Sequence, residues 1–225
     1  MTRLVLVPSP FVGARSWRAT AAQLPDAVIA DYRPLEGPDW YETVARRVAA
    51  QAGDAPWIAV LHSGAGGFAP AMAEAAANLA GLIFADAVLP YPGRSCLENA
   101  PAWLAQALHR LRQADGRLAP WDRWFPEDPL PRLIPDDGER AAFQADLPRT
   151  PFAFLEALSK PSARWEAVPS GYLQLSRGYA DTADLAAARG WPVRRHRLNH
   201  LAPAAHPAKV AAALSELGAR LITGS

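Results

Sequence analysis

The chain has 225 residues, half of them hydrophobic, which is enough for one domain with a sizeable core. Its 23 basic and 22 acidic residues leave a formal net charge of +1, so charge attracts it neither to nucleic acid nor to a membrane. The single cysteine, Cys96, excludes an internal disulfide framework, and no metal-binding spacing such as C-x-x-C or H-E-x-x-H occurs. We therefore expect no metal and no cofactor.

The first apolar run, residues 4–7, has only the length of a strand and leads directly into Pro8-Ser9-Pro10. A signal peptide needs a longer hydrophobic segment, so we expect the protein to be cytoplasmic. Three more such runs follow in the first half of the chain, at residues 27–30, 57–61 and 82–85.

Segments with a helical pattern separate these runs. Trp40, Val44 and Val48 recur every four residues after Asp39, which is typical of a capped helix lying on a sheet. Residues 69–79, rich in alanine, form the next expected helix. This alternation predicts parallel strands joined by crossover helices.

The pattern changes between residues 91 and 169, where prolines and tryptophans become frequent and strand-like runs stop. Residues 97–111 and 138–147 are expected to be short helices. Linkers lack such aromatic content, so this segment is interpreted as a helical lid inserted into the domain.

Beyond the insertion the sheet pattern returns. Residues 172–175 and, more weakly, 193–198 look like strands, and an amphipathic helix closes the chain. We therefore predict a core made of residues 1–90 and 170–225, with the lid at 91–169.

Ser63 stands where the third apolar run meets small residues, in the sequence LHSGAGG at 61–67. A serine at a sharp turn from strand to helix presents its hydroxyl above the sheet, beside free backbone N–H groups. The match to the nucleophile pattern G-x-S-x-G is incomplete, because Leu61 stands in place of its first glycine. A glycine-rich helix start with a capping serine is the structural alternative.

A nucleophilic serine needs a base, and five histidines are candidates. His62 adjoins the serine and would point elsewhere, while His109 lies on an expected lid helix. His196 falls within the last expected strand, and His206 stands at the start of the closing helix, where a cap is ordinary. His200 remains, between the last strand and the closing helix, as the expected base.

With the serine turn, the insertion and His200 in this order, the chain resembles a compact member of the α/β-hydrolase superfamily. In that family the nucleophile follows a central strand, a lid follows the next strand, and the catalytic histidine follows the last. The resemblance spans nearly the whole chain, although the two leading strands of larger members are missing. It implies a mostly parallel, doubly wound α/β sheet of about six strands with a helical lid insertion.

The resemblance leaves two places for the acid that orients the histidine. Asp86 directly follows the run 82–85, where open α/β sheets gather ligands. Asp181 follows the run 172–175 and is an ordinary helix cap in the alternative reading. We favour Asp86, whose structural alternative is to hold the adjacent loop.

The implied oxyanion hole departs from the family pattern. One donor is expected to be the backbone N–H of Gly64, and the other comes from the loop after the first run. In that loop Pro10 has no N–H to give. The second donor is therefore expected to be Phe11 or the Ser9 hydroxyl, unless the hole is incomplete.

These residues predict a serine hydrolase in which His200 takes the Ser63 proton and Ser63 attacks an ester-like or other carbonyl carbon. Ser9, Trp124 and Glu127 are the candidate substrate contacts, with simple exposure as the alternative for Glu127. The aromatic lid favours a small to medium-sized, mostly apolar substrate.

Two other functions stay open. A non-hydrolytic enzyme of the same fold, a cyclase or lyase, would use Ser63 and His200 as acid and base, and a non-catalytic binder would hold an apolar ligand under the lid. In each case the partner is a small molecule, and the protein is a monomer or a homodimer. No G-x-G-x-x-G or G-x-x-x-x-G-K pattern is present in support of nucleotide binding.

Overall fold

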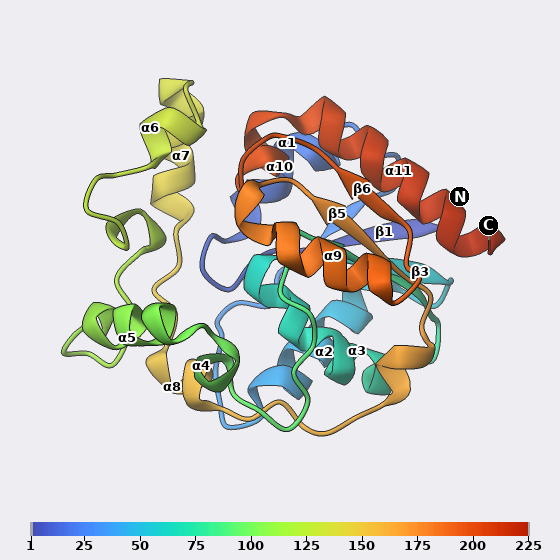
Figure 1. The fold of residues 1–225 in the computed structure, drawn as a ribbon, viewed down its shortest axis with the longest axis horizontal. Coiled ribbons are helices and arrows are strands. Elements are labelled where there is room, and N and C mark those ends of the chain that lie inside the picture. Colours follow the sequence, from blue (N-terminus) through green and yellow to red (C-terminus); the bar gives the residue numbers. More distant parts are fainter. Residues whose placement is uncertain (1, 225) are drawn as a thin grey trace.

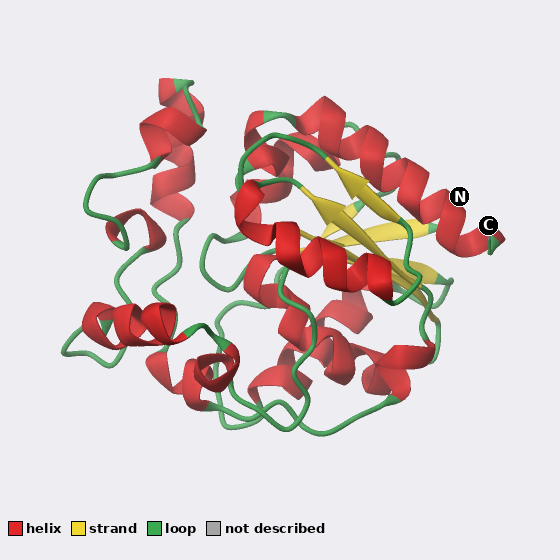
Figure 2. Ribbon diagram, in the orientation of Figure 1, coloured by secondary structure: helices red, strands yellow, loops and turns green. Residues whose placement is uncertain are grey.

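The computed structural model describes residues 2–224, which form a six-stranded parallel sheet between two layers of helices (Figures 1 and 2). The strands lie in the order β2-β1-β3-β4-β5-β6. Their bounds are β1 (Arg3–Val7), β2 (Val28–Ile29), β3 (Trp57–His62), β4 (Leu79–Ala85), β5 (Ser170–Gln174) and β6 (Val193–Arg195). The predicted α/β class and the number of strands are confirmed.

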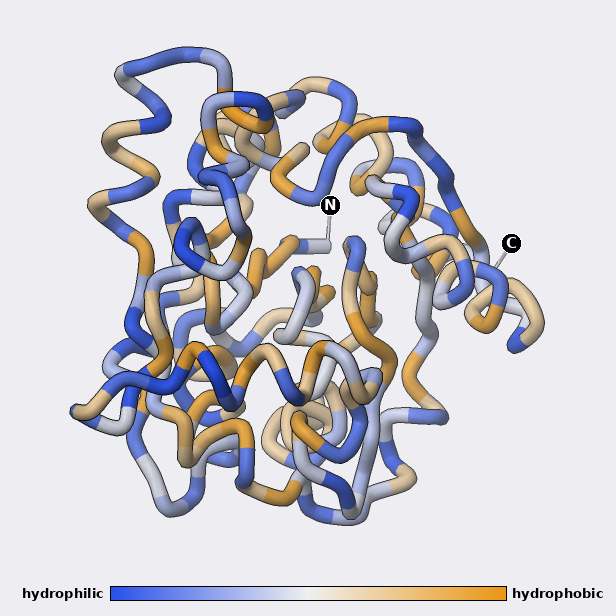
Figure 3. The backbone as a smooth tube through the Cα atoms, turned by 60° about the vertical axis from the view of Figure 1, so that its left-hand side comes forward, coloured by the Kyte–Doolittle hydropathy of each residue, from blue (hydrophilic) through white to orange (hydrophobic). Residues whose placement is uncertain are grey.

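Alternate side chains of each strand enter two separate hydrophobic layers, because successive residues of a strand point to opposite faces. Val5 and Phe84 pack in the layer beneath α2, α3 and α9, whereas Leu6 and Ile83 pack in the layer beneath α1 and α11. The helices on the sheet are α1 (Arg18–Ala21), α2 (Trp40–Ala52), α3 (Ala69–Ala75), α9 (Ala180–Ala188), α10 (Ala202–Ala205) and α11 (Pro207–Thr223). Figure 3 shows the hydrophobic stretches, in orange, running through the middle of the molecule.

Three expected elements have different bounds in the structure. The helix expected over 69–79 stops at Ala75, because Ala76 turns to extended backbone and the chain enters β4 at Leu79. β4 therefore begins three residues before the expected run 82–85, since Gly81 interrupts the apolar pattern that marks a strand. The last strand, β6, ends at Arg195, so His196 lies just beyond it.

Residues 86–169 connect β4 to β5, and within this fully described segment no strand joins the sheet. The helix expected over 97–111 is split in two, because Pro101 adopts an extended conformation before the second part. The helices of the segment are α4 (Cys96–Asn99), α5 (Ala102–Leu111), α6 (Leu130–Leu133), α7 (Asp137–Asp146) and α8 (Phe152–Glu156). Figure 1 shows α5, α6 and α7 standing apart from the sheet. That this insertion acts as a lid stays a prediction.

The insertion is attached to the sheet end by a small hydrophobic cluster of its own. Trp121, Leu130 and Phe143 of the insertion pack there with Val12 and Leu201. Val12 follows β1 and Leu201 precedes α10, so the cluster lies at the edge where the parallel strands end. Among residues 2–224, no helix has both the length and the hydropathy needed to cross a bilayer.

Candidate active site

Ser63 follows β3 directly and opens the short 3-10 helix η2 (Ser63–Phe68). Its φ of 56° lies in the left-handed region, which costs a residue with a side chain about 1–3 kcal/mol. The turn is held by the N–H of Val88, which donates to the Ser63 carbonyl at 3.1 Å. A Cβ on Gly66 would overlap the carbonyl oxygen of Val88, and one on Gly67 would overlap the Tyr91 hydroxyl. The turn therefore requires glycine at positions 66 and 67, where the sequence has it.

Asp86 and His200 are joined by a hydrogen bond. Asp86 follows β4 and is fully buried, and its Oδ2 lies 3.1 Å from Nδ1 of His200. Three further donors follow β5: the N–H groups of Leu175 and Ser176 reach Oδ1 at 2.7 and 3.0 Å, and the Ser176 hydroxyl reaches Oδ2 at 2.5 Å. A carboxylate only accepts, so the His200 proton lies on Nδ1 and Nε2 is left as the acceptor.

The surroundings of Asp86 keep its carboxyl group ionised. Burial by itself raises the pKa of Asp86. The hydrogen bond and charge of His200, with the Ser176 hydroxyl and the Leu175 N–H, outweigh burial and hold that pKa below its usual value. A negative charge is therefore present beside His200 at neutral pH, where it would stabilise a protonated imidazole.

Two rings stack on the imidazole of His200. The ring of His62 has its centroid 4.7 Å away at an interplanar angle of 28°, and the ring of Tyr179 lies 5.2 Å away at 7°. Nε2 of His62 is 3.0 Å from the carbonyl oxygen of His200 and donates to it. Burial, then the charge of His200, lowers the pKa of His62 to about 3, so His62 is a neutral support for the catalytic candidate.

Burial raises the pKa of Tyr179 to about 12, against a smaller lowering by the nearby Ser63 hydroxyl. In the described part of the chain no hydrogen bond joins Ser63 to His200 directly. Catalytic hydrogen bonds are often loose in sites without substrate and tighten when it binds. Ser63, Asp86, Tyr179 and His200 thus gather where β3, β4, β5 and β6 end.

The loop after β1 packs on the Ser63 turn but uses its own N–H groups internally. Pro10 has no N–H, and the N–H of Phe11 donates to Oγ of Ser9 at 3.3 Å. The next two N–H groups donate to the Ser9 carbonyl at 3.3 and 3.2 Å. The Phe11 ring would lie 2.8 Å from a Cβ on Gly64, so the loop and the turn are in close contact. Among the described residues no acceptor takes the Ser9 hydroxyl proton, which leaves it free to donate.

Among the described residues, the remaining candidates make no hydrogen bond to Ser63, Asp86 or His200. The Trp124 ring packs 5.1 Å from the Phe11 ring, and its indole N–H donates to the Ala119 carbonyl at 2.8 Å. Glu127 is exposed on the insertion. Asp181 is exposed in the first turn of α9, and the carboxylate bonded to His200 is that of Asp86.

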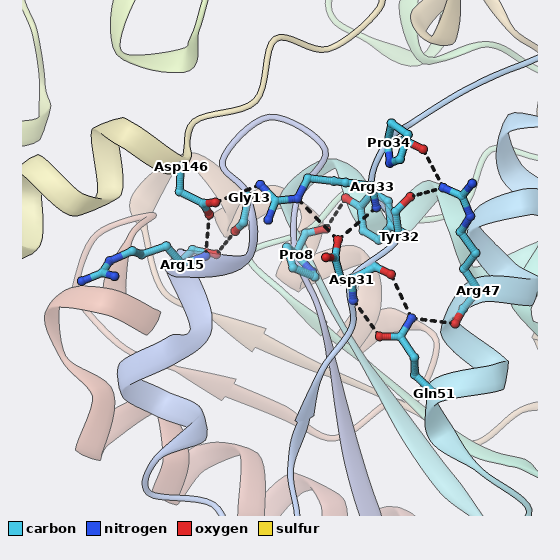
Figure 4. Close-up of polar contacts among 11 residues, drawn as sticks. Pro8, Gly13, Arg15, Asp31, Tyr32, Arg33, Pro34, Arg47, Gln51 and Asp146 are labelled. Carbon is cyan, nitrogen blue, oxygen red and sulfur yellow. Dashed lines mark hydrogen bonds and ion pairs between the residues drawn. The ribbon is translucent and has the colours of Figure 1, made fainter.

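A cavity of about 430 Å³ lies beside the loop after β1, between residues 8–10, 30–35 and 148–151. Figure 4 shows how this region is held together. Asp146 of α7 accepts from the backbone N–H of Arg15 and from the Arg33 guanidinium, both at 2.9 Å. These contacts tie the insertion to the loops after β1 and β2. In the part of the chain that the structure describes, no three His, Cys, Asp or Glu side chains are grouped to hold a metal ion.

Sequence reasoning missed three residues of this cluster: Ser176, which supports Asp86, Tyr179, which stacks on His200, and His62, which supports His200. The available signal was position, because Ser176 and Tyr179 lie between β5 and α9, at the edge where Ser63 and Asp86 lie. Nothing in the local sequence specifies which way these side chains point.

No family model matches the sequence, and no curated protein matches it. The structure is similar to an extracellular α/β-hydrolase from a Paenibacillus species, with a TM-score of 0.77, 18% identity and coverage of 96% of this chain and 99% of that one. It is also similar to a pyrethroid hydrolase from Sphingobium faniae, with a TM-score of 0.69, 18% identity and 96% of each chain covered. Tomato methylketone synthase I complexed with 2-tridecanone gives a TM-score of 0.68 at 15% identity, with 98% of each chain covered. These likenesses show that the chain has the α/β-hydrolase fold.

Proposed function

We propose that the protein is a serine hydrolase that cleaves an ester-like bond of a small to medium-sized, mostly apolar molecule. The observation that carries this proposal is the hydrogen bond between buried Asp86 and Nδ1 of His200. This bond leaves Nε2 of His200 free to act as the base. The His200 ring also stacks on His62, the residue that precedes Ser63.

The reaction follows from these positions. Oγ of Ser63 attacks the carbonyl carbon while Nε2 of His200 takes the hydroxyl proton. The Gly64 N–H and the Ser9 hydroxyl donate to the oxyanion, and His200 returns the proton to the departing alcohol. A water, deprotonated by His200, then attacks the acyl group on Ser63 and releases the acid.

The substrate class rests on the apolar surroundings of the Ser63 turn. The Phe11 ring lies against Gly64, and the Trp124 ring packs on Phe11. Such a surface favours an apolar acyl or alcohol group through burial of its area. Among the similar structures, one is called a pyrethroid hydrolase, which agrees with an apolar substrate.

Hydrolysis of p-nitrophenyl butyrate tests this function. We expect turnover by the wild-type protein and a loss of kcat of at least about 10³-fold in both Ser63→Ala and His200→Ala. His109→Gln, on the exposed side of α5, is the matched control and should keep the wild-type rate. Wild-type turnover that survives Ser63→Ala would contradict the proposal.

The loop after β1 favours a second function, a non-hydrolytic reaction in which Ser63 and His200 act as acid and base. Its N–H groups have partners inside the loop, and losing one oxyanion donor costs about 10²–10³ in kcat. One similar structure is a methylketone synthase. In this case Ser63→Ala keeps appreciable turnover of the true substrate and His200→Ala does not, whereas a non-catalytic binder would be unaffected by either change.

A further inference from the structure

Thr150 joins the insertion to the loop after β1 by a buried hydrogen bond. Its hydroxyl donates to the Pro10 carbonyl at 2.5 Å, and both residues are buried. The Thr150 backbone is itself held in place, because its carbonyl accepts from the N–H of Leu118 at 2.8 Å. A donor that is held in this way fixes the direction of the carbonyl group that it reaches.

The direction of the Pro10 carbonyl decides where the Phe11 N–H points, because both belong to one peptide group. That peptide is trans and planar, so its C=O and N–H point in opposite directions. With the carbonyl held towards Thr150, the N–H points to the other side and donates to Oγ of Ser9 at 3.3 Å. The peptide therefore links the position of Thr150 to that of Ser9.

The Ser9 hydroxyl is a donor that the proposed reaction uses at the oxyanion. A serine side chain turns between rotamers and its hydroxyl rotates, so by itself it has no fixed direction. The hydrogen bond from Phe11 holds Oγ in one place and leaves its proton free to donate. Hydrogen bonds in a chain also polarise one another, so donation by Thr150 makes the Ser9 hydroxyl a better donor.

A second contact from the same segment of the insertion holds the far end of the loop. The carboxylate of Asp146 accepts from the backbone N–H of Arg15 at 2.9 Å, and a Cβ on Gly13 would lie 2.8 Å from it (Figure 4). Gly13 also has a φ of 71°, which favours glycine, so the loop and the insertion approach closely there. Residues 146–150 thus hold the loop at Gly13 and at Pro10.

We propose that Thr150 is a positioning residue of the oxyanion hole, which acts through the peptide of Pro10 and Phe11 on the Ser9 hydroxyl. Thr150 keeps its proton throughout, so it adds no step to the reaction. The inference rests on the proposed function, because it concerns a donor to the same oxyanion.

NMR of the peptide between Pro10 and Phe11 tests the contact without any substrate. Carbon-13 in the proline carbonyls and nitrogen-15 in the phenylalanines leave two signals in an HNCO spectrum, since the chain has two Pro-Phe peptides, 10–11 and 151–152. Phe11→Leu removes and so identifies the first signal. We expect the Pro10 carbonyl signal to move upfield in Thr150→Val and to return in Thr150→Ser. A Pro10 signal that does not move in Thr150→Val overturns the proposal.

Kinetics with p-nitrophenyl butyrate tests the role. Valine keeps the shape of threonine without its hydroxyl, so in Thr150→Val the oxyanion donor is misplaced and we expect kcat to fall at least about tenfold with KM within about twofold. Thr150→Ser keeps the hydroxyl and should restore kcat to within about threefold of the wild-type value.

Thr20→Val is the matched control. The Thr20 hydroxyl is also buried and also donates to a proline carbonyl, that of Pro203, at 2.6 Å. Both valine variants lose a buried hydrogen bond, so both should unfold at a lower urea concentration than the wild-type protein. Thr20→Val should nevertheless keep the wild-type kcat, which separates the positioning role from a general loss of stability.

A double-mutant cycle tests whether Thr150 acts through Ser9. Ser9→Ala removes the hydroxyl that Thr150 positions, so in the Ser9→Ala background Thr150→Val should change kcat by less than about twofold. Losses of kcat that multiply in the double variant overturn the proposal, because Thr150 would then affect the site by another route.

The outcomes separate the two proposals. Active wild-type protein with an equally active Thr150→Val variant overturns the role of Thr150 and leaves the hydrolase function standing. A raised KM with unchanged kcat in Thr150→Val does the same. Wild-type protein that neither hydrolyses the ester nor reacts with a fluorophosphonate contradicts the proposed function and with it the role of Thr150, and the NMR signals still show whether Thr150 holds the peptide.

Discussion

The free energy of unfolding is expected to fall less steeply in His62→Gln than in the wild-type protein as the pH drops below neutral. His62 is fully buried, and burial lowers its pKa to about 3, whereas an unfolded histidine titrates near 6.5. Below pH 6.5 the unfolded chain binds a proton at His62 that the folded protein does not. The free energy of unfolding therefore falls as the pH falls from about 6.5 towards 3.

The size of this effect follows from the window between the two pKa values. Each pH unit well inside it is worth about 1.4 kcal/mol, and the slope is about half of that at pH 6.5 itself, so His62 removes about 2 kcal/mol between pH 6.5 and 4.5. That is a large part of the roughly 5–15 kcal/mol that stabilises a typical domain. Asp86 acts at lower pH, because its pKa is depressed and its stabilising contribution is lost only below about pH 4.

Urea unfolding followed by tryptophan fluorescence at several pH values between 7 and 4.5 measures the effect. Glutamine retains an N–H group for the His200 carbonyl but does not titrate, so His62→Gln should lose about 2–3 kcal/mol less than the wild-type protein over this range. His109→Gln, which removes an exposed histidine, should follow the wild-type curve. A His62→Gln variant with the wild-type pH dependence would refute the reasoning.

Asp86→Asn should lower kcat for p-nitrophenyl butyrate by about 10³-fold or more, because an amide holds the wrong imidazole tautomer and cannot stabilise its charge, while Asp181→Asn should have no effect. Equal losses of kcat in the two variants would contradict the assignment of Asp86 as the acid that orients His200. Gly66→Ala should destabilise the protein by at least about 2 kcal/mol in urea unfolding, because its Cβ would overlap the carbonyl oxygen of Val88. Gly138→Ala, on the exposed first turn of α7, is the control and should leave the free energy of unfolding unchanged. A Gly66→Ala protein as stable as the wild type would show that the Ser63 turn can relax.

The sheet could be predicted from the sequence because its central strands are continuous apolar runs. Parallel strands covered on both faces need such runs, and residues 4–7 and 57–61 match β1 and β3 within one residue at their ends. Helix ends were less predictable. The pattern of alanines at 69–79 does not show where the helix stops, and the split at Pro101 depends on how the insertion packs.

Residues of the candidate site could be predicted where they follow a strand, because that place in the chain puts them at the edge of the sheet. Ser63, Asp86 and His200 each follow a strand, and parallel strands end at one edge. Contacts that depend on side-chain direction were not predictable. The sequence says nothing of whether Tyr179 turns towards His200, or of whether the N–H of Phe11 turns back to Ser9. Both depend on loop conformations that the distant packing of the insertion and α9 determines.

Reaction with a fluorophosphonate, followed by intact mass and peptide mapping, tests the central claim most directly. We predict that the wild-type protein takes up one phosphonyl group, that the group maps to Ser63, and that Ser63→Ala takes up none. Folded wild-type protein that stays unlabelled, or a label on another residue, would contradict the assignment of Ser63 as the nucleophile.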